Sequence, residues 1–107
     1  MNLTSAPRLK TVARVTYGLG QPPQLANNGI PIVRATNIVR GRISPVGLVF
    51  AALADIPLDR APLLRAGEIL VVRSGAYTGD SALITPEWVG SAPGYDLRVH
   101  ETITRAM

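Results

Sequence analysis

A continuous apolar run between two glycine-containing turns constrains this chain more than any other feature of its sequence. The run is EILVVR, residues 68–73, which follows the Ala66-Gly67 turn and precedes the loop SGAYTG. An uninterrupted apolar run rich in β-formers is typical of a strand that is buried on both faces. The segment DSALIT then returns as a second strand, so the sequence predicts a β-hairpin.

Three other segments favour short strands. The segment GIPIVRATNIVRGRI predicts one strand near residues 31–35 and another near residues 42–44, with an Arg-Gly turn at 40–41 between them. The following segment predicts a short strand at 48–50 and a single helical turn before Pro57. In GYDLRVHE, apolar and polar residues alternate, as they do in a half-buried strand.

The N-terminal segment favours a helix. In PRLKTVARVTYG the apolar side chains form one stripe at helical spacing, and Pro7 suits the first turn of a helix. We therefore predict a short helix that begins near Pro7 and ends at the Tyr17-Gly18 pair. A loop dense in Gly, Pro and Asn follows it.

The expected fold class is therefore α+β, with a short N-terminal helix and a mixed or antiparallel twisted sheet. A chain of 107 residues is sufficient for one domain with a modest core. We expect residues 1–8 to be a lead-in, residues 9–101 to be the domain and residues 102–107 to be a tail. No apolar run reaches the roughly 18–20 residues that span a bilayer, and no signal peptide is evident. We therefore expect a cytoplasmic protein without membrane contact.

The residue inventory argues against catalysis. The chain has no cysteine and a single histidine, His100, so a thiolate zinc site and a cysteine nucleophile are excluded. A nuclease site requires a lysine near a group of acidic residues. The only lysine, Lys10, is far in sequence from any acidic pair. Gly18 and Gly20 are followed by Pro23, where a dinucleotide-binding motif has glycine. We therefore expect a protein that is not an enzyme and that uses no cofactor or metal.

The charge balance favours a nucleic-acid partner. Eleven basic residues against seven acidic ones give a net charge of +4, and ten of the eleven are arginine. The guanidinium group presents a planar fork of donors that matches phosphate and the edge of guanine, which lysine does not. A coding bias toward arginine is the alternative explanation of this composition.

Two polar clusters are candidates for the contact with DNA. In PIVRATNIVRGR, Arg40 and Arg42 flank a glycine and are expected to be exposed and to meet phosphate. Arg34 and Asn37 have the side chains best suited to guanine and adenine, but they can equally be internal ties that fix a turn.

The second cluster lies in VVRSGAYTGD, where a buried strand delivers a glycine-rich loop. Its glycines let backbone N–H groups approach a phosphate, its aromatic ring offers a stacking face, and its hydroxyls can bond phosphate or base edges. The alternative is an ordinary tight loop whose glycines satisfy positive φ. The candidate residues of this loop are Arg73, Ser74, Tyr77 and Thr78.

Taken together, these segments resemble the target-recognition domains of type I restriction–modification specificity subunits. The resemblance lies in Tyr17-Gly18, in the unit that runs from Ile30-Pro31 through Arg34, Asn37-Ile38 and Gly41 to Ile43, and in Leu64 through Gly67-Glu68-Ile69-Leu70 to Arg73-Ser74-Gly75. The order and spacing agree over roughly residues 9–100. Each motif is loose alone, but three in this order are fairly specific.

The resemblance implies a non-catalytic module that recognises a specific sequence in double-stranded DNA. It also implies a partner, the modification subunit, which methylates adenine with S-adenosylmethionine. A full recognition domain is roughly half as long again, so we expect either a truncated or split subunit or a fragment, with an incomplete sheet. An open sheet edge invites pairing with a second copy, and a homodimer is expected. The alternative function is an assembly module that does not read DNA itself.

Overall fold

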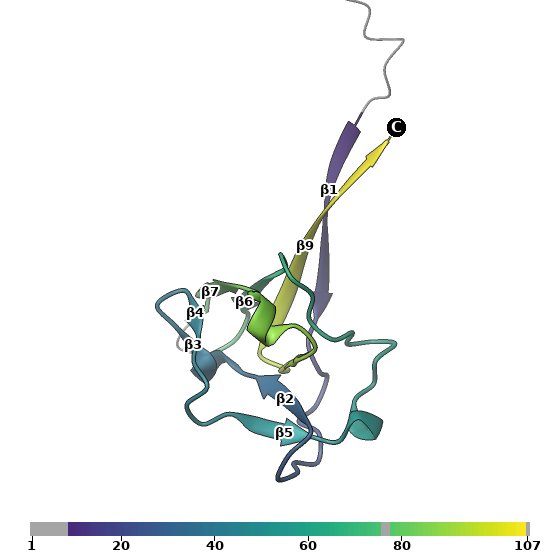
Figure 1. Ribbon diagram of the computed structural model, residues 1–107. Helices are drawn as coiled ribbons and strands as arrows, with labels where there is room; N and C mark the ends of the chain where they lie inside the picture. Colours follow the sequence, from purple (N-terminus) through teal and green to yellow (C-terminus); the bar gives the residue numbers. More distant parts are fainter. Residues whose placement is uncertain (1–8, 76–77, 107) are drawn as a thin grey trace, which may run out of the picture.

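The fold was determined as a computed structural model that describes residues 9–75 and 78–106. Its described part is β-rich and contains three sheets joined by loops (Figure 1). The strands are β1 (Leu9–Tyr17), β2 (Ile30–Val33), β3 (Ile38–Val39), β4 (Arg42–Ile43), β5 (Val49–Ala51), β6 (Ile69–Val72), β7 (Ser81–Leu83), β8 (Ala92–Pro93) and β9 (Leu97–Ala106). The helical elements are the single 3-10 turns η2 (Ala35–Asn37), η3 (Leu53–Asp55) and η4 (Pro86–Trp88).

The predicted N-terminal helix is wrong for residues 9–17, which form strand β1. This strand pairs antiparallel with β9 along its whole length, from Leu9 opposite Ala106 to Tyr17 opposite Arg98. The segment is rich in Thr and Val, whose branched side chains favour an extended backbone. Residues 9–17 therefore form a strand because they pair with residues 98–106, although the spacing of their apolar residues also fits a helix. The expected boundary between domain and tail, at residue 101, falls inside β9.

The largest sheet has four antiparallel strands in the order β1-β9-β6-β7. The hairpin predicted around the apolar run is confirmed as β6 and β7, with Leu70 opposite Ala82. The prediction that this strand is buried on both faces is wrong, because Leu70 and Val72 are buried while Ile69 is exposed. Strand β6 lies in an antiparallel sheet that is covered on one face only.

The inner face of the four-stranded sheet carries the main core. Alternate residues of its strands pack against β2, the turn η2 and the partly buried Trp88. The alternation predicted for GYDLRVHE is confirmed from Leu97 onward. Leu97 and Val99 are buried, whereas Arg98 and His100 are only half-buried. The buried members of this core are Val33, Ala35, Ile38, Leu64, Leu70, Val72, Ala82, Ile84, Leu97 and Val99.

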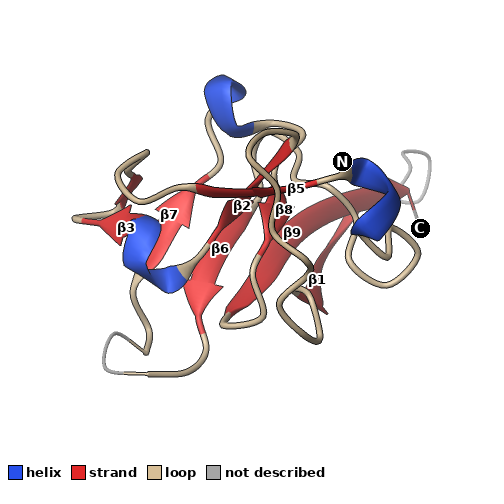
Figure 2. Ribbon diagram, turned by 90° about the horizontal axis from the view of Figure 1, so that it is seen from below, coloured by secondary structure: helices blue, strands red, loops and turns tan. Residues whose placement is uncertain are grey.

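A second, mixed sheet has the order β5-β2-β8, in which β2 pairs antiparallel with β5 and parallel with β8. The strands predicted near 31–35 and 48–50 are confirmed here, and so is the helical turn before Pro57. This sheet lies beside the four-stranded sheet (Figure 2). A smaller core of six buried residues packs against it: Leu19, Ile32, Ala51, Ile56, Ala61 and Ala92.

Gly18 is required where the first strand leaves the sheet. A Cβ at this position would lie 1.9 Å from the carbonyl oxygen of Gly94, so only glycine allows the two backbones to approach. The backbone N–H of Gly18 donates to Leu97, and that of Leu19 donates to Pro93. The first bond extends the pairing of β1 with β9, and the second joins this end of the four-stranded sheet to strand β8 of the mixed sheet.

The pair β1 and β9 extends beyond the body of the molecule as a two-stranded ribbon (Figure 1). Strand β6 pairs with β9 only from Leu97 to His100, so residues 101–106 pair with β1 alone. The ribbon contributes to an elongated outline of 59 × 30 × 23 Å. Within the described ranges, no helix has both the length and the apolar character that crossing a membrane requires.

Candidate nucleic-acid interface

The strands β3 and β4 form a minimal hairpin whose turn is the predicted pair Arg40-Gly41. Ile38 lies opposite Ile43 and Val39 lies opposite Arg42, which leaves two residues in the turn. Both turn residues have positive φ, 53° for Arg40 and 78° for Gly41. Two-residue hairpins favour this geometry because it matches the twist of the strands, but it is unfavourable for a residue with a side chain.

The hairpin presents two arginines to solvent. Arg40 and Arg42 are both exposed, one at the turn and one on the adjoining strand. Arg40 is the one described non-glycine residue with positive φ. Strained backbone of this kind concentrates at functional positions, where the surrounding structure holds it in place. The backbone geometry of Arg40 therefore marks the tip of this hairpin as a candidate functional position.

The glycine-rich loop between β6 and β7 lies at the same end of the molecule as the hairpin (Figures 1 and 2). A Cβ placed on Gly41 would lie 4.0 Å from the carbonyl oxygen of Ser81, the first residue of β7. The structure thus places the hairpin turn next to the start of β7, the strand that follows the glycine-rich loop. Tyr77 lies outside the described residues.

Arg73 is held at the base of this loop by three contacts. Its backbone N–H donates to the carbonyl of Asp96 (2.8 Å), and its Nε donates to the carbonyl of Tyr95 (2.7 Å). Its guanidinium carbon lies 5.1 Å from the centre of the Tyr17 ring, which is a cation–π arrangement. Arg73 is exposed, but its position is fixed by these neighbours.

The loop itself is closed by backbone hydrogen bonds. Gly79 donates to Val72 (2.9 Å), and the hydroxyl of Thr78 donates to the carbonyl of Gly75 (2.7 Å). Gly75 and Gly79 have φ of 92° and 97°, which glycine adopts without strain. Ser74 and Thr78 are exposed, and the Thr78 oxygen retains its capacity to accept a hydrogen bond.

Asn37 lies inside the protein and all its side-chain contacts are to backbone. It is fully buried; its Oδ1 accepts from the backbone N–H of Arg34 (3.0 Å), and its Nδ2 donates to the carbonyls of Ser44 (3.0 Å) and Val46 (3.1 Å). Through these bonds Asn37 ties the segment before the hairpin, at Arg34, to the segment after it, at Ser44 and Val46. Of the two roles left open for Asn37, this geometry is that of the internal tie.

Arg34 is half-buried and is bonded to the segment that follows the hairpin. Its Nη2 donates to the carbonyl of Gly47 (2.9 Å), and its side chain lies beside Gly94. Asp96, which the sequence did not single out, supports the same region because its Oδ2 accepts from the backbone N–H of Ala35 (3.0 Å). No pattern in the sequence indicates this contact, which joins residues 61 positions apart.

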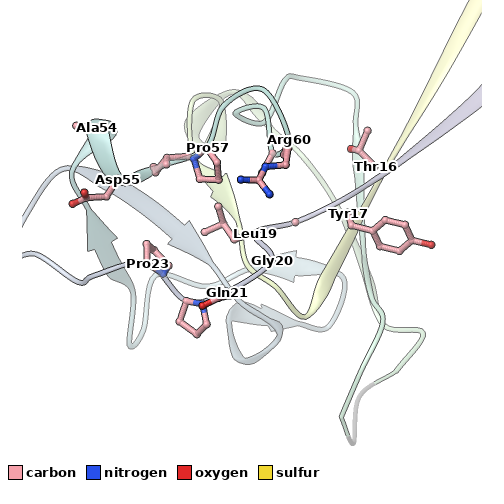
Figure 3. Close-up of a pocket in the computed structure, with 14 residues that line it drawn as sticks. Thr16, Tyr17, Leu19, Gly20, Gln21, Pro23, Ala54, Asp55, Pro57 and Arg60 are labelled. Atoms are coloured by element: carbon pink, nitrogen blue, oxygen red, sulfur yellow. The ribbon is translucent and has the colours of Figure 1, made fainter.

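A cavity lies elsewhere, and none of the predicted DNA-contacting residues lines it. It has a volume of about 710 Å³ and lies between the loop that follows β1 and the segment 54–61. In Figure 3, Arg60 lies over Leu19, while the ring of Tyr17 turns away from them. In the described ranges, no three His, Cys, Asp or Glu side chains gather as a metal site would require.

The polar residues with the right chemistry for DNA therefore divide into two groups. One group is exposed at the hairpin tip and the β6–β7 loop, and the other is folded into the body beneath the hairpin. A comparison with protein-family models found no match for this chain, and a comparison with curated proteins found none either.

Proposed function

We propose that this protein is a DNA-recognition module of the kind found in type I restriction–modification specificity subunits. The supporting observation is that the exposed arginine turn of the β3–β4 hairpin lies beside the start of β7, on the side of the molecule where the glycine-rich β6–β7 loop also lies. In this proposal the module carries no catalytic residues, and a modification subunit supplies the methylation chemistry. The proposal rests on the motifs together with this geometry.

The hairpin tip supplies the phosphate contacts. Arg40 and Arg42 are exposed and long enough to reach a backbone that passes the end of the molecule. Guanidinium groups bind phosphate through paired, charge-assisted hydrogen bonds, which position a protein on the duplex without reading the sequence. The rigid two-residue turn reduces the conformational entropy that binding costs.

The β6–β7 loop supplies the contacts that depend on sequence. Arg73 can present its terminal nitrogens to guanine while Nε remains bonded to Tyr95. Ser74 and Thr78 add hydroxyl groups at the same end, and Tyr77 is assigned to this surface from its place in the sequence. Arg34 and Asn37 are assigned to the support of the hairpin, since the amide of Asn37 is bonded within the fold and Nη2 of Arg34 donates to Gly47.

The test is binding to a pool of random duplex DNA across a salt series, with sequencing of the retained fraction. The affinity of the wild-type chain should fall with salt at a log–log slope of about −0.9 per neutralised phosphate. The double variant Arg40→Ala/Arg42→Ala should reduce the magnitude of that slope by about 1.8, and Arg60→Ala, on the exposed wall of the cavity, should leave it unchanged. An unchanged slope in the double variant would show that the assigned surface is wrong.

A second candidate function, an assembly module, is favoured by the free edge of β1. This nine-residue strand pairs with β9 on one side, and none of the described strands pairs with its other side. A long edge of this kind can pair with a second copy of the chain. Sedimentation velocity across a hundredfold concentration range distinguishes the two functions: association without salt-dependent DNA binding supports assembly, and a monomer that binds DNA excludes it.

A further inference from the structure

The outer face of the four-stranded sheet is apolar although nothing in the described chain covers it. Successive residues of a strand point to opposite faces. The residues that alternate with the buried ones therefore lie on this side of the sheet. Four large side chains on it are exposed: Val15 (44%), Tyr17 (55%), Ile69 (41%) and Leu83 (54%). The register places Val15, His100, Ile69 and Leu83 in one row across all four strands. We refer to this surface as the outer face.

The charged groups of the outer face are basic. Arg98 lies between Tyr17 and Val71 in the neighbouring row, and Arg73 stacks on Tyr17 at its end. The four strands contain one acidic residue, Glu101, which alternation places on the opposite side, across from Arg14. The outer face therefore combines an apolar row with cationic side chains and lacks a carboxylate from its own strands.

Two nitrogen atoms on this face lack partners. Nε of Arg98 and Nε2 of His100 are shielded from solvent and make no hydrogen bond with the described residues. Part of each of these two side chains is thus already dehydrated. These two atoms are themselves inaccessible, so a carboxylate of a partner would meet the rest of the half-buried Arg98 guanidinium. Its charge-assisted hydrogen bonds would form in partly dehydrated surroundings, where such bonds are stronger than in water.

We propose that the outer face docks an acidic amphipathic helix of a partner protein. A helix supplies apolar side chains for the row that runs from Val15 to Leu83, and glutamates beside them meet Arg98. A second copy of this chain fits less well, because it would bring two sets of these basic side chains together. DNA also fits less well, because phosphate gains nothing from the exposed apolar row. The inference does not depend on the DNA-binding proposal.

The test uses two synthetic helical peptides with the same leucine stripe, one flanked by glutamate and the other by lysine. Anisotropy of the labelled peptides measures affinity, and amide chemical shifts of the labelled protein locate the contact. The glutamate peptide should bind at least tenfold more tightly than the lysine peptide and should shift the amides of Ile69, Leu83 and Arg98. Equal binding of both peptides, or shifts confined to other surfaces, would overturn the proposal.

Variants on the protein provide the matched controls. Ile69→Ser/Leu83→Ser should weaken the glutamate peptide at least tenfold, and Arg98→Gln should abolish the preference for glutamate over lysine. Val46→Ser removes an apolar side chain that is even more exposed (80%) from another surface, and it should change neither the affinity for the glutamate peptide nor the preference for it. Two results would overturn the proposal in favour of another occupant: a homodimer that Ile69→Ser/Leu83→Ser dissociates, or duplex DNA that shifts the same amides.

Discussion

Residues 34–37 and residues 40–42 carry similar polar side chains but differ in their surroundings. Arg34 and Asn37 are tied to the backbone of the segment 44–47, whereas Arg40 and Arg42 are exposed on the hairpin a few positions later. The difference arises because a two-residue turn directs its own side chains outward, while the strand ends beneath it must satisfy buried backbone groups. One motif can therefore contain both the support of a binding surface and the surface itself.

The substitution Asn37→Ala should have the largest effect and should act on stability. It leaves a backbone N–H and two carbonyls without their bonds inside the fold, at a cost of about 3–5 kcal/mol in the free energy of unfolding. Urea denaturation measures this loss, and Asn28→Ala, an exposed asparagine, should stay within about 0.5 kcal/mol of wild type. An Asn37→Ala variant that is as stable as wild type but binds DNA weakly would show that Asn37 contacts DNA, as the hairpin tip is proposed to do.

The substitution Arg40→Asn should move stability and DNA affinity in opposite directions. Asparagine tolerates positive φ better than arginine, so the free energy of unfolding should rise by about 0.5–1 kcal/mol. The same change removes a guanidinium and should reduce the salt slope of DNA binding by about 0.9. Thermal unfolding and a salt titration on one preparation test both parts. A variant that is less stable than wild type would contradict the strained-turn account.

The smallest effect concerns Glu68, at the end of β6 away from the candidate interface. Burial raises the pKa of this carboxyl above its ordinary value of 4.5, although the N–H of Arg65 donates to it. Above pH 4.5 the folded chain keeps a proton that the unfolded chain has released, so stability falls as pH rises through this window. Glu68→Gln should flatten this part of the pH profile of urea midpoints while DNA binding stays unchanged. A profile identical to wild type would show that Glu68 titrates normally.

Local turn chemistry made part of this molecule predictable. The Arg40-Gly41 turn, the β6–β7 hairpin and the helical turn before Pro57 each depend on a few adjacent residues, and each lies where the sequence indicated. The exposure of Arg40 and Arg42 follows from the same turn. These features required no knowledge of distant parts of the chain.

Other features depend on partners that are distant in sequence. Val12 and Val15 fit a helical stripe and a strand equally well, and only the pairing of residues 9–17 with residues 98–106 decides between them. The burial of one face of β6, the bond between Asp96 and Ala35, and the outer face likewise require the assembled sheet.

The sequence by itself thus determined the turns, most of the short strands and the basic character of the hairpin tip, because these follow from backbone preferences and composition. The tertiary structure alone decided which of the candidate arginines are bonded inside the fold, that the N-terminal segment is a strand, and that one sheet face is left apolar and uncovered. The reason is that side-chain burial and hydrogen bonding depend on neighbours in space, and most of those neighbours are remote in the chain.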